Sequence, residues 1–199
     1  AGGTYPYDYL VVALGCRTSW FGRADWERHA PGLKTIGDAL SIRNRLLGAY
    51  EAAETTTDAA ERKRLMTVVV VGGGPTGVEL AGACAELARH VLRRDFRAID
   101  PRQTRVLLIE AMDRILPQLP ERLGRAAAHE LERLGVEVRT TTRVREVDAT
   151  GVTVGVIGGI DGTLVHGFGV ILFALGRGDS GGATRLLGSM DTVDAIVCG

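Results

Sequence analysis

The sequence predicts an α/β fold, a Rossmann-like parallel sheet with helices on its faces and a small antiparallel β-meander. Two observations carry this prediction. Between residues 66 and 139, apolar runs of strand length alternate with segments of helical periodicity, the pattern of parallel strands joined by right-handed crossover helices. Beyond Thr140 the pattern changes to short alternating stretches separated by glycine- and aspartate-containing turns, which favours antiparallel pairing.

Length, charge and cysteine content set the outer limits. The 199 residues can bury a sizeable core, enough for one domain and part of another. With 24 basic and 24 acidic residues, the chain shows no electrostatic bias toward nucleic acid. Cys16, Cys84 and Cys198 lie too far apart for a disulfide framework or a metal site, so we expect a cytoplasmic, reducing environment. No apolar stretch is long enough to span a bilayer, and the N-terminus lacks the features of a secretion signal.

The first 65 residues lead into the sheet. Tyr7–Gly15 (YDYLVVALG) reads as a short apolar strand, either an ordinary first strand or part of a domain that begins earlier. Residues 20–31 are predicted to form a loop packed through Trp20, Phe21 and Trp26.

Residues 37–54 place apolar side chains among charges and predict an amphipathic helix. After a break at residues 55–57, Asp58 and Glu61 have capping-box spacing and predict a short helix up to Leu65. These two helices would form a connection into the first strand of the parallel sheet.

The central stretch is Met66–Gly82, MTVVVVGGGPTGVELAG. Its consecutive valines predict a strand buried on both faces. Gly72, Gly74 and Gly77 then have G-x-G-x-x-G spacing, which suits a tight turn, close approach of the backbone to a pyrophosphate, and close packing of the next helix. The alternative is a turn that is rich in glycine only for packing.

A long helix is predicted from Thr76 to about Arg94, and the free N–H groups at its start favour an anion. Its expected inner face comprises Val78, Leu80 or Ala81, Cys84, Leu87, Val91 and Leu92. Cys84 is interpreted as a small buried hydrophobic residue.

Arg105–Ile109 is the second predicted strand, and Glu110 at its end can accept hydrogen bonds from adenosine ribose hydroxyls. Pro120 is expected as the first residue of a helix to Leu134, which Gly135 ends. Val136–Arg139 is the third strand.

The predicted meander consists of Val144–Val147, Val152–Val154 and Leu164–His166. Gly169–Ala174 is predicted as one more buried strand, and residues 178–199 are rich in glycine and remain unassigned.

Several stretches in a consistent order, from Tyr7 to Arg177, resemble the two-dinucleotide-binding-domain flavoproteins of the pyridine nucleotide-disulfide oxidoreductase family. The resemblance is greatest to the type II NADH:quinone oxidoreductases. The stretches are YDYLVVALG, HAPGLKTIGDAL, VVVVGGGPTGVELAGACAEL, VLLIEAMDRILP, LERLGVEV and FALGR. In that family an FAD-binding domain is interrupted by an NADH-binding domain.

The resemblance therefore implies that this chain is an internal piece with the FAD/NAD(P)-binding domain fold. Residues 1–30 would be the end of an incomplete FAD-binding domain, 31–65 a helical connection, 66–177 the NADH-binding domain and 178–199 an unassigned tail. We expect this piece alone to be inactive, because much of the flavin site would lie outside it.

The resemblance also assigns the site residues by position. Glu110 would hold the adenosine ribose, and the NADH pyrophosphate would lie against Gly72, Gly74, Pro75, Thr76 and Gly77. A carboxylate at position 110 repels a 2′-phosphate, and Ala111 and Met112 add no positive charge, which favours NADH over NADPH. Arg114 is the nearest arginine.

On the flavin side, Glu79 matches the family glutamate that faces the nicotinamide and flavin. Its alternative role is to stabilise the helix dipole as a first-turn acid. Gly176 would lie beside the nicotinamide, and Ala13 and Gly15 would contact FAD, although Leu14 replaces the family threonine between them.

The resemblance implies an enzyme that takes hydride from NADH onto FAD and passes electrons to a quinone, without proton pumping. The full-length protein would be peripheral on the cytoplasmic face of the membrane, and a homodimer is a compatible assembly. Two alternatives stay open: a non-catalytic NAD(H)-binding module or remnant, and a flavoprotein reductase acting on ferredoxin, peroxide or a disulfide.

The scattered histidines match neither a metal site nor a catalytic triad: His29, His90, His129 and His166.

Overall fold

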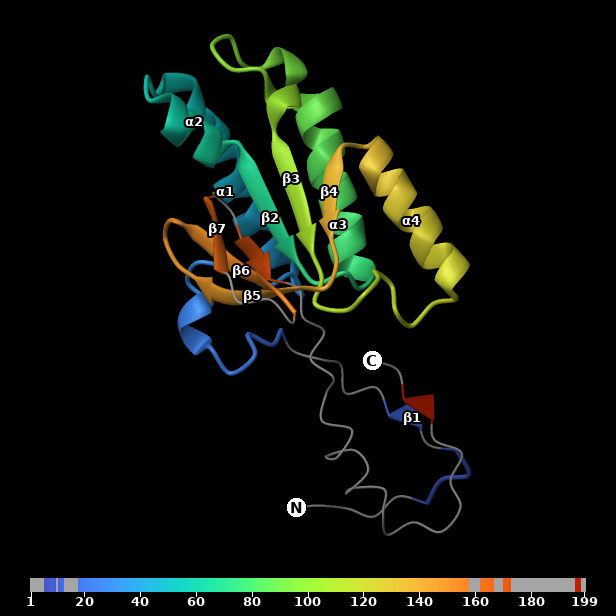
Figure 1. The fold of residues 1–199 in the computed structure, drawn as a ribbon. Coiled ribbons are helices and arrows are strands. Elements are labelled where there is room, and N and C mark those ends of the chain that lie inside the picture. Colours follow the sequence, from blue (N-terminus) through green and yellow to red (C-terminus); the bar gives the residue numbers. More distant parts are fainter. Residues whose placement is uncertain are drawn as a thin grey trace. The chain divides into compact units, whose positions relative to one another are not determined.

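The computed structural model describes residues 6–9, 11–12, 18–157, 162–166, 170–172 and 196–197. The chain divides into two compact units, one formed by Ala1–Arg17 with Leu175–Gly199 and the other by Thr18–Ala174. In the first unit, β1 (Val11–Val12) pairs in parallel with β9 (Ile196–Val197). The second unit contains the other helices and strands described below (Figure 1).

A four-stranded parallel sheet forms the centre of the second unit. Its order is β4-β3-β2-β8, with bounds β2 (Thr67–Val71), β3 (Arg105–Ile109), β4 (Val136–Arg139) and β8 (Val170–Leu172). Each neighbouring pair is parallel, which confirms the predicted sheet. Every residue of β2 is buried, as expected of a central strand with apolar side chains on both faces.

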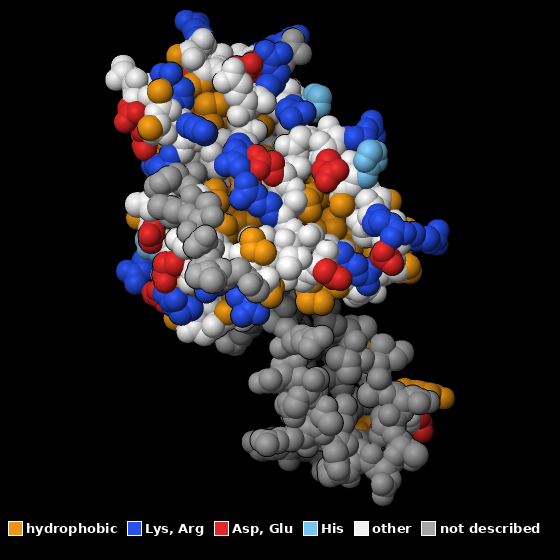
Figure 2. Space-filling view, viewed as in Figure 1, with side chains coloured by type: hydrophobic (Ala, Val, Ile, Leu, Met, Phe, Trp, Pro, Cys, Tyr) orange, Lys and Arg blue, Asp and Glu red, His pale blue; other side chains and the backbone are white. Residues whose placement is uncertain are grey.

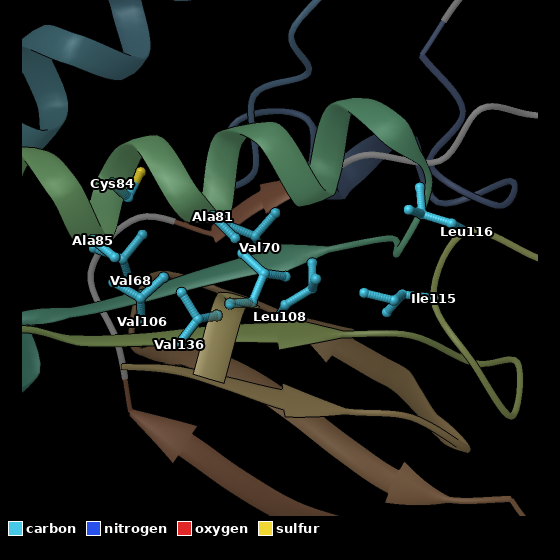
Figure 3. Packing of buried hydrophobic residues seen from close by; sticks show 11 residues of the cluster. Val68, Val70, Ala81, Cys84, Ala85, Val106, Leu108, Ile115, Leu116 and Val136 are labelled. Carbon is cyan, nitrogen blue, oxygen red and sulfur yellow. The ribbon is translucent and has the colours of Figure 1, made fainter. Parts of the chain in front are cut away.

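The two faces of the sheet are covered differently (Figure 1). Side chains on one face of the sheet, including Val68, Val70 and Leu108, pack against helices α3 (Pro75–Glu86) and α4 (Glu121–Arg133). Figure 3 shows this packing, with Ala81 and Ala85 of α3 over the strands and Cys84 in the same cluster. Side chains on the other face, including Val69 and Leu107, pack against the meander and Trp26.

The meander is an antiparallel sheet of β5 (Thr142–Val147), β6 (Gly151–Val156) and β7 (Gly162–His166). This confirms the predicted antiparallel meander. Its register shifts between Val144 and Glu146, so the period-2 pattern is interrupted there.

Helix α1 (Ile36–Thr55) begins at a capping box formed by Thr35 and Asp38. Helix α2 (Ala59–Leu65) is capped by Asp58, whose carboxylate accepts from Ala60 N–H and Glu61 N–H. The predicted reciprocal box at Asp58 is wrong, because the Glu61 carboxylate is bound by Arg64 and the Asp58 N–H donates to Thr56 Oγ1.

Helix α3 (Pro75–Glu86) continues as a π-helical turn, Leu87–Val91, and a short 3₁₀ turn, Leu92–Arg94. The predicted extent of this helix is therefore correct. Val91 was expected inside but is 63% exposed, whereas Ala88 and Leu92 are buried. The wider π turn changes the angular spacing that a constant 3.6-residue period assumes.

Pro120 is the N-cap of helix α4 (Glu121–Arg133), whereas the sequence predicts it as the first helical residue. After the helix, Gly135 has a φ of +78°, as is common where a helix ends. A 3₁₀ turn, Pro101–Gln103, precedes β3. In a third apolar cluster, Tyr50 and Ala53 of α1 pack with Leu92 and Ile99.

Residues 20–31 contain a 3₁₀ turn, Ala24–Trp26, and are attached as predicted through Trp20 and Trp26. Trp20 Nε1 donates to Ala30 O at 2.9 Å, and Trp26 is buried. The expectation for Phe21 is wrong: its side chain is 64% exposed, and its φ of +53° belongs to a turn.

Lysine and arginine side chains are interspersed with acidic ones over the face seen in Figure 2. No helix in the described part of the chain has both the length and the apolar character that crossing a membrane requires. Within the same residues, histidine, cysteine, aspartate and glutamate form no group suited to a metal ion.

Candidate dinucleotide-binding site

The glycine turn lies at the carboxyl ends of β2 and β3, before the first residue of α3. Gly72 has a φ of +105°, a conformation that favours glycine, and its N–H donates to Ile109 O at 2.8 Å. A Cβ on Gly77 would overlap the Gly72 carbonyl oxygen. The first and third motif glycines therefore do what the spacing predicts, a tight turn followed by close helix packing.

The start of α3 faces the same turn. Gly74 is its N-cap in an extended conformation and Pro75 occupies the first helical position. Pro75 has no N–H, and the N–H groups of Thr76 and Gly77 belong to the first turn, where a helix offers no internal acceptor. These donors and the positive end of the helix dipole favour an anionic group.

Glu110 extends from the end of β3 into this turn. Its Oε2 accepts from Gly73 N–H at 2.6 Å, and its Oε1 accepts from Met112 N–H at 2.7 Å. The backbone of Glu110 is also fixed, since its N–H donates to Arg139 O and its C=O accepts from Thr142 N–H. Each carboxylate oxygen keeps a second lone pair for another donor, such as a ribose hydroxyl.

Gly73 is a site residue that the motif spacing treats as variable. A Cβ there would lie 2.8 Å from Ile115 Cγ2 and 3.1 Å from the Cβ and Cγ of Glu110. The backbone must therefore pass close to both side chains. The signal in the sequence is the middle glycine of the run GGG, because the motif requires only Gly72 and Gly74 there.

Residues 111–119 form the wall beside the turn. Leu116 N–H donates to Gly73 O at 2.7 Å, and Leu116 has a φ of +50°. Ile115 and Leu116 are buried, and Figure 3 shows Ile115 pointing toward Leu108 of β3. Arg114 donates from Nη2 to Pro117 O at 2.7 Å and from Nη1 to Leu119 O at 3.0 Å, so backbone carbonyls hold its guanidinium.

The flavin-side residues are only partly described. Glu79 is exposed on α3, two residues beyond Gly77. Ala13, Gly15 and Gly176 lie outside the described residues. The structure thus brings the predicted pyrophosphate and ribose residues together at one edge of the sheet.

Cys84 lies within the core, away from this turn along α3. Burial raises the pKa of its thiol to about 11. The neutral thiol is a poor nucleophile, which agrees with its interpretation as a packing residue.

The residues present fit a dinucleotide. The start of α3 offers the N–H groups of Thr76 and Gly77 to a pyrophosphate, and Glu110 offers acceptors where a ribose needs them. For a flavin, the described residues supply Glu79 alone among those that the sequence predicts.

Comparison with known proteins gives consistent matches. The sequence model of the family "Pyridine nucleotide-disulphide oxidoreductase" matches residues 1–181. In Mycobacterium tuberculosis, the type II NADH:quinone oxidoreductase NdhA is 50% identical over 149 residues, which are 75% of this chain and 32% of NdhA. The type II NADH:quinone oxidoreductase Ndh of the same organism is 45% identical over 155 residues, covering 77% of this chain and 34% of Ndh.

Among solved structures, NDH2 from Plasmodium falciparum in complex with NADH superposes with a TM-score of 0.75 at 27% identity. The match covers 85% of this chain and 34% of that protein. The chain thus spans about a third of the length of these relatives.

Proposed function

The chain belongs to the pyridine nucleotide-disulphide oxidoreductase family, and from that premise we propose that it is the NADH-binding part of an FAD-dependent NADH:quinone oxidoreductase. The observation that carries the proposal is the Glu110 carboxylate, fixed beside the glycine turn by the N–H groups of Gly73 and Met112. A carboxylate at the end of the second strand of a Rossmann unit is positioned for the adenosine ribose hydroxyls.

Binding of the coenzyme divides between two groups of residues. The pyrophosphate lies over the start of α3, against the backbone of Gly72, Gly74, Pro75, Thr76 and Gly77. Glu110 accepts from the ribose hydroxyls and repels a 2′-phosphate, so NADH is preferred. The contacts of Arg114 with two backbone carbonyls support this preference, because they direct its guanidinium into the wall of the site.

The flavin side involves residues farther along the chain. FAD, when bound, supplies the acceptor for the hydride of NADH. Glu79 faces this region and contributes a negative charge near the nicotinamide. Its expected role as a first-turn acid is wrong, because α3 begins at Pro75 and its first turn holds no acidic residue. Gly176 leaves room for the nicotinamide, and Ala13 and Gly15 contact the flavin.

This assignment gives each part of the chain a role. Residues 66–177 bind NADH, residues 31–65 connect, and residues 1–30 belong to the FAD-binding domain. The quinone acceptor is proposed because the Mycobacterium tuberculosis relatives carry that activity in their names. We also propose that the whole protein associates peripherally with the cytoplasmic face of the membrane, and that a homodimer is its assembly.

The full-length protein tests the proposal directly. We expect purified protein to show the visible absorbance of a bound flavin, which NADH bleaches anaerobically and a soluble quinone restores. Failure to bind flavin would leave a non-catalytic NAD(H)-binding module. Faster turnover with ferredoxin, peroxide or a disulfide than with quinone would assign a different acceptor.

A further inference from the structure

We infer that Arg114 is a positioning residue for coenzyme selection. It fixes residues 114–119, hereafter the 114–119 turn. This turn holds Gly73, and Gly73 in turn orients the Glu110 carboxylate. The inference rests on the proposed function, because it explains how the same site distinguishes NAD(H) from NADP(H). Arg114 itself contacts the backbone and not the coenzyme.

The first step is the attachment of Arg114 to the turn. Its two terminal nitrogens donate to Pro117 O and Leu119 O, at 2.7 and 3.0 Å. A planar guanidinium can make both bonds in one orientation, whereas a lysine ammonium has no such fork. Arg114 is the first residue of the 114–119 turn, and its side chain therefore links the start of the turn to the turn's end.

The second step is the strained residue inside this turn. Leu116 has a φ of +50°, a conformation that is costly for a branched side chain without another constraint. The surroundings impose it: Leu119 N–H donates to Leu116 O at 2.9 Å, and the Leu116 side chain is buried in the core. Loss of the Arg114 contacts removes one constraint that holds Leu116 in this conformation.

The third step leads from Leu116 to Glu110. Leu116 N–H donates to Gly73 O, and Gly73 N–H donates to Glu110 Oε2 at 2.6 Å. Gly73 is thus held on both sides, and Ile115 packs where its Cβ would be. If Leu116 relaxes, Gly73 loses the hydrogen bond to its carbonyl oxygen, and its N–H, the donor that orients the Glu110 carboxylate, is held less firmly.

The consequence is selective. Glu110 binds NAD(H) through hydrogen bonds to the ribose hydroxyls, and these bonds depend on its orientation. The 2′-phosphate of NADP(H) replaces one of those hydroxyls, so NADP(H) gains little from that orientation. Release of the 114–119 turn should therefore weaken NAD(H) more than NADP(H).

The opposite role for Arg114 predicts the opposite result. An arginine that bound the 2′-phosphate directly would contribute to NADP(H) affinity, and its removal would spare NAD(H). A lysine would then retain much of that contribution, because it keeps the charge. The two roles are therefore separable by the ratio of the two affinities and by the lysine variant.

Calorimetric titration of the full-length flavoprotein with NAD⁺ and with NADP⁺ tests the inference. We expect Arg114→Ala and Arg114→Lys each to weaken NAD⁺ about tenfold and NADP⁺ less than about twofold. The matched control is Arg133→Ala on α4, which removes an exposed arginine paired with Glu130 at 2.7 Å and should leave both affinities unchanged.

An unchanged ratio of affinities in Arg114→Ala would overturn the inference, whether both affinities are retained or both fall together as in general destabilisation. Retention of the wild-type ratio by Arg114→Lys, or loss of NADP⁺ binding alone, would also overturn it. Arg114→Lys keeps the test available if the alanine variant does not fold. A wild-type protein that binds neither coenzyme would instead refute the proposed function.

Discussion

The Glu110 carboxylate accepts a hydrogen bond from Gly73 N–H at 2.6 Å, joining the acidic end of β3 to the glycine turn after β2. The same carboxylate accepts from Met112 N–H through its other oxygen. Both oxygens are thus oriented by backbone donors of the protein itself. Such preorganisation reduces the entropy that binding must overcome.

Replacement of Glu110 tests this arrangement. We expect Glu110→Ala to weaken NAD⁺ by about tenfold or more, because charge-assisted hydrogen bonds to the ribose are lost. NADP⁺ should be weakened less or bind better, since the repulsion of its 2′-phosphate is removed. Titration of the full-length protein with both coenzymes measures this, with Glu130→Ala on α4 as the control. Unchanged affinities for both coenzymes would refute the ribose assignment.

Gly77 provides a test of the turn itself. Its Cβ would overlap the carbonyl oxygen of Gly72, and a backbone atom cannot move aside as a flexible side chain can. We expect Gly77→Ala to lower the thermal unfolding midpoint and to abolish measurable NAD⁺ binding.

Gly82→Ala is the matched control for Gly77→Ala in the same helix. Its Cβ would make ordinary contacts, 3.7 Å from Leu131 Cδ2 and 3.9 Å from Leu134 Cδ1. Alanine is favoured over glycine inside a helix by roughly 0.5–1 kcal/mol, so we expect this variant to be at least as stable as the wild type. Equal behaviour of the two variants in a melting experiment would show that the close approach at Gly77 is unimportant.

The parts of the fold that the sequence predicts correctly are those governed by local apolar patterns. Arg105–Ile109 and Val136–Arg139 are strands with the predicted bounds. The first is central and mostly apolar because it is buried between two layers, whereas the second alternates apolar and charged residues at the edge of the sheet. The turn at Gly72 is predictable because it needs a positive φ, and glycine is the residue that adopts a positive φ without steric cost.

Features that depend on distant contacts were not predictable. Periodicity cannot reveal the π turn that exposes Val91, and no local pattern places Phe21 outside. The wall of the site was missed for the same reason: Leu116 N–H reaches Gly73 O only after β2 and β3 have paired. The hydrogen-bonding role of Gly73 depends on Glu110, 37 residues later in the chain.

Glu54 makes one of these distant contacts. At the end of α1, its carboxylate accepts from the N–H groups of Arg97, Ala98 and Ile99, and these bonds hold its pKa below the usual range. A lowered folded-state pKa stabilises the protein above the unfolded-state pKa, and the contribution is lost as pH falls through the folded-state value.

We therefore expect Glu54→Gln to lower the unfolding midpoint at neutral pH, and the difference from wild type to shrink under acidic conditions. Thermal melts at a series of pH values measure it. Glu51→Gln is the control, an exposed glutamate one turn earlier in the same helix. A difference that stays constant, or grows, as the pH is lowered would contradict the role of the Glu54 carboxylate.

Tyr50 and Thr104 form a buried hydrogen bond between α1 and the residue before β3, with 2.7 Å between their side-chain oxygens. Burial raises the pKa of Tyr50 to about 12, so the pair is neutral and should not respond to pH in the physiological range. Tyr50→Phe keeps the ring in the core but leaves the Thr104 hydroxyl, in a residue only 8% exposed, without this partner.

An unsatisfied buried hydroxyl costs about 1–3 kcal/mol, so Tyr50→Phe should be destabilising by that amount. Thr104→Val should lower the free energy of unfolding by a similar amount, because it leaves the Tyr50 hydroxyl without its partner. The double variant removes both polar groups and should cost less than the sum of the two, because neither partner is then left unpaired. Denaturant unfolding of the four proteins completes the cycle, and strictly additive free energies would show that the hydrogen bond does not couple α1 to β3.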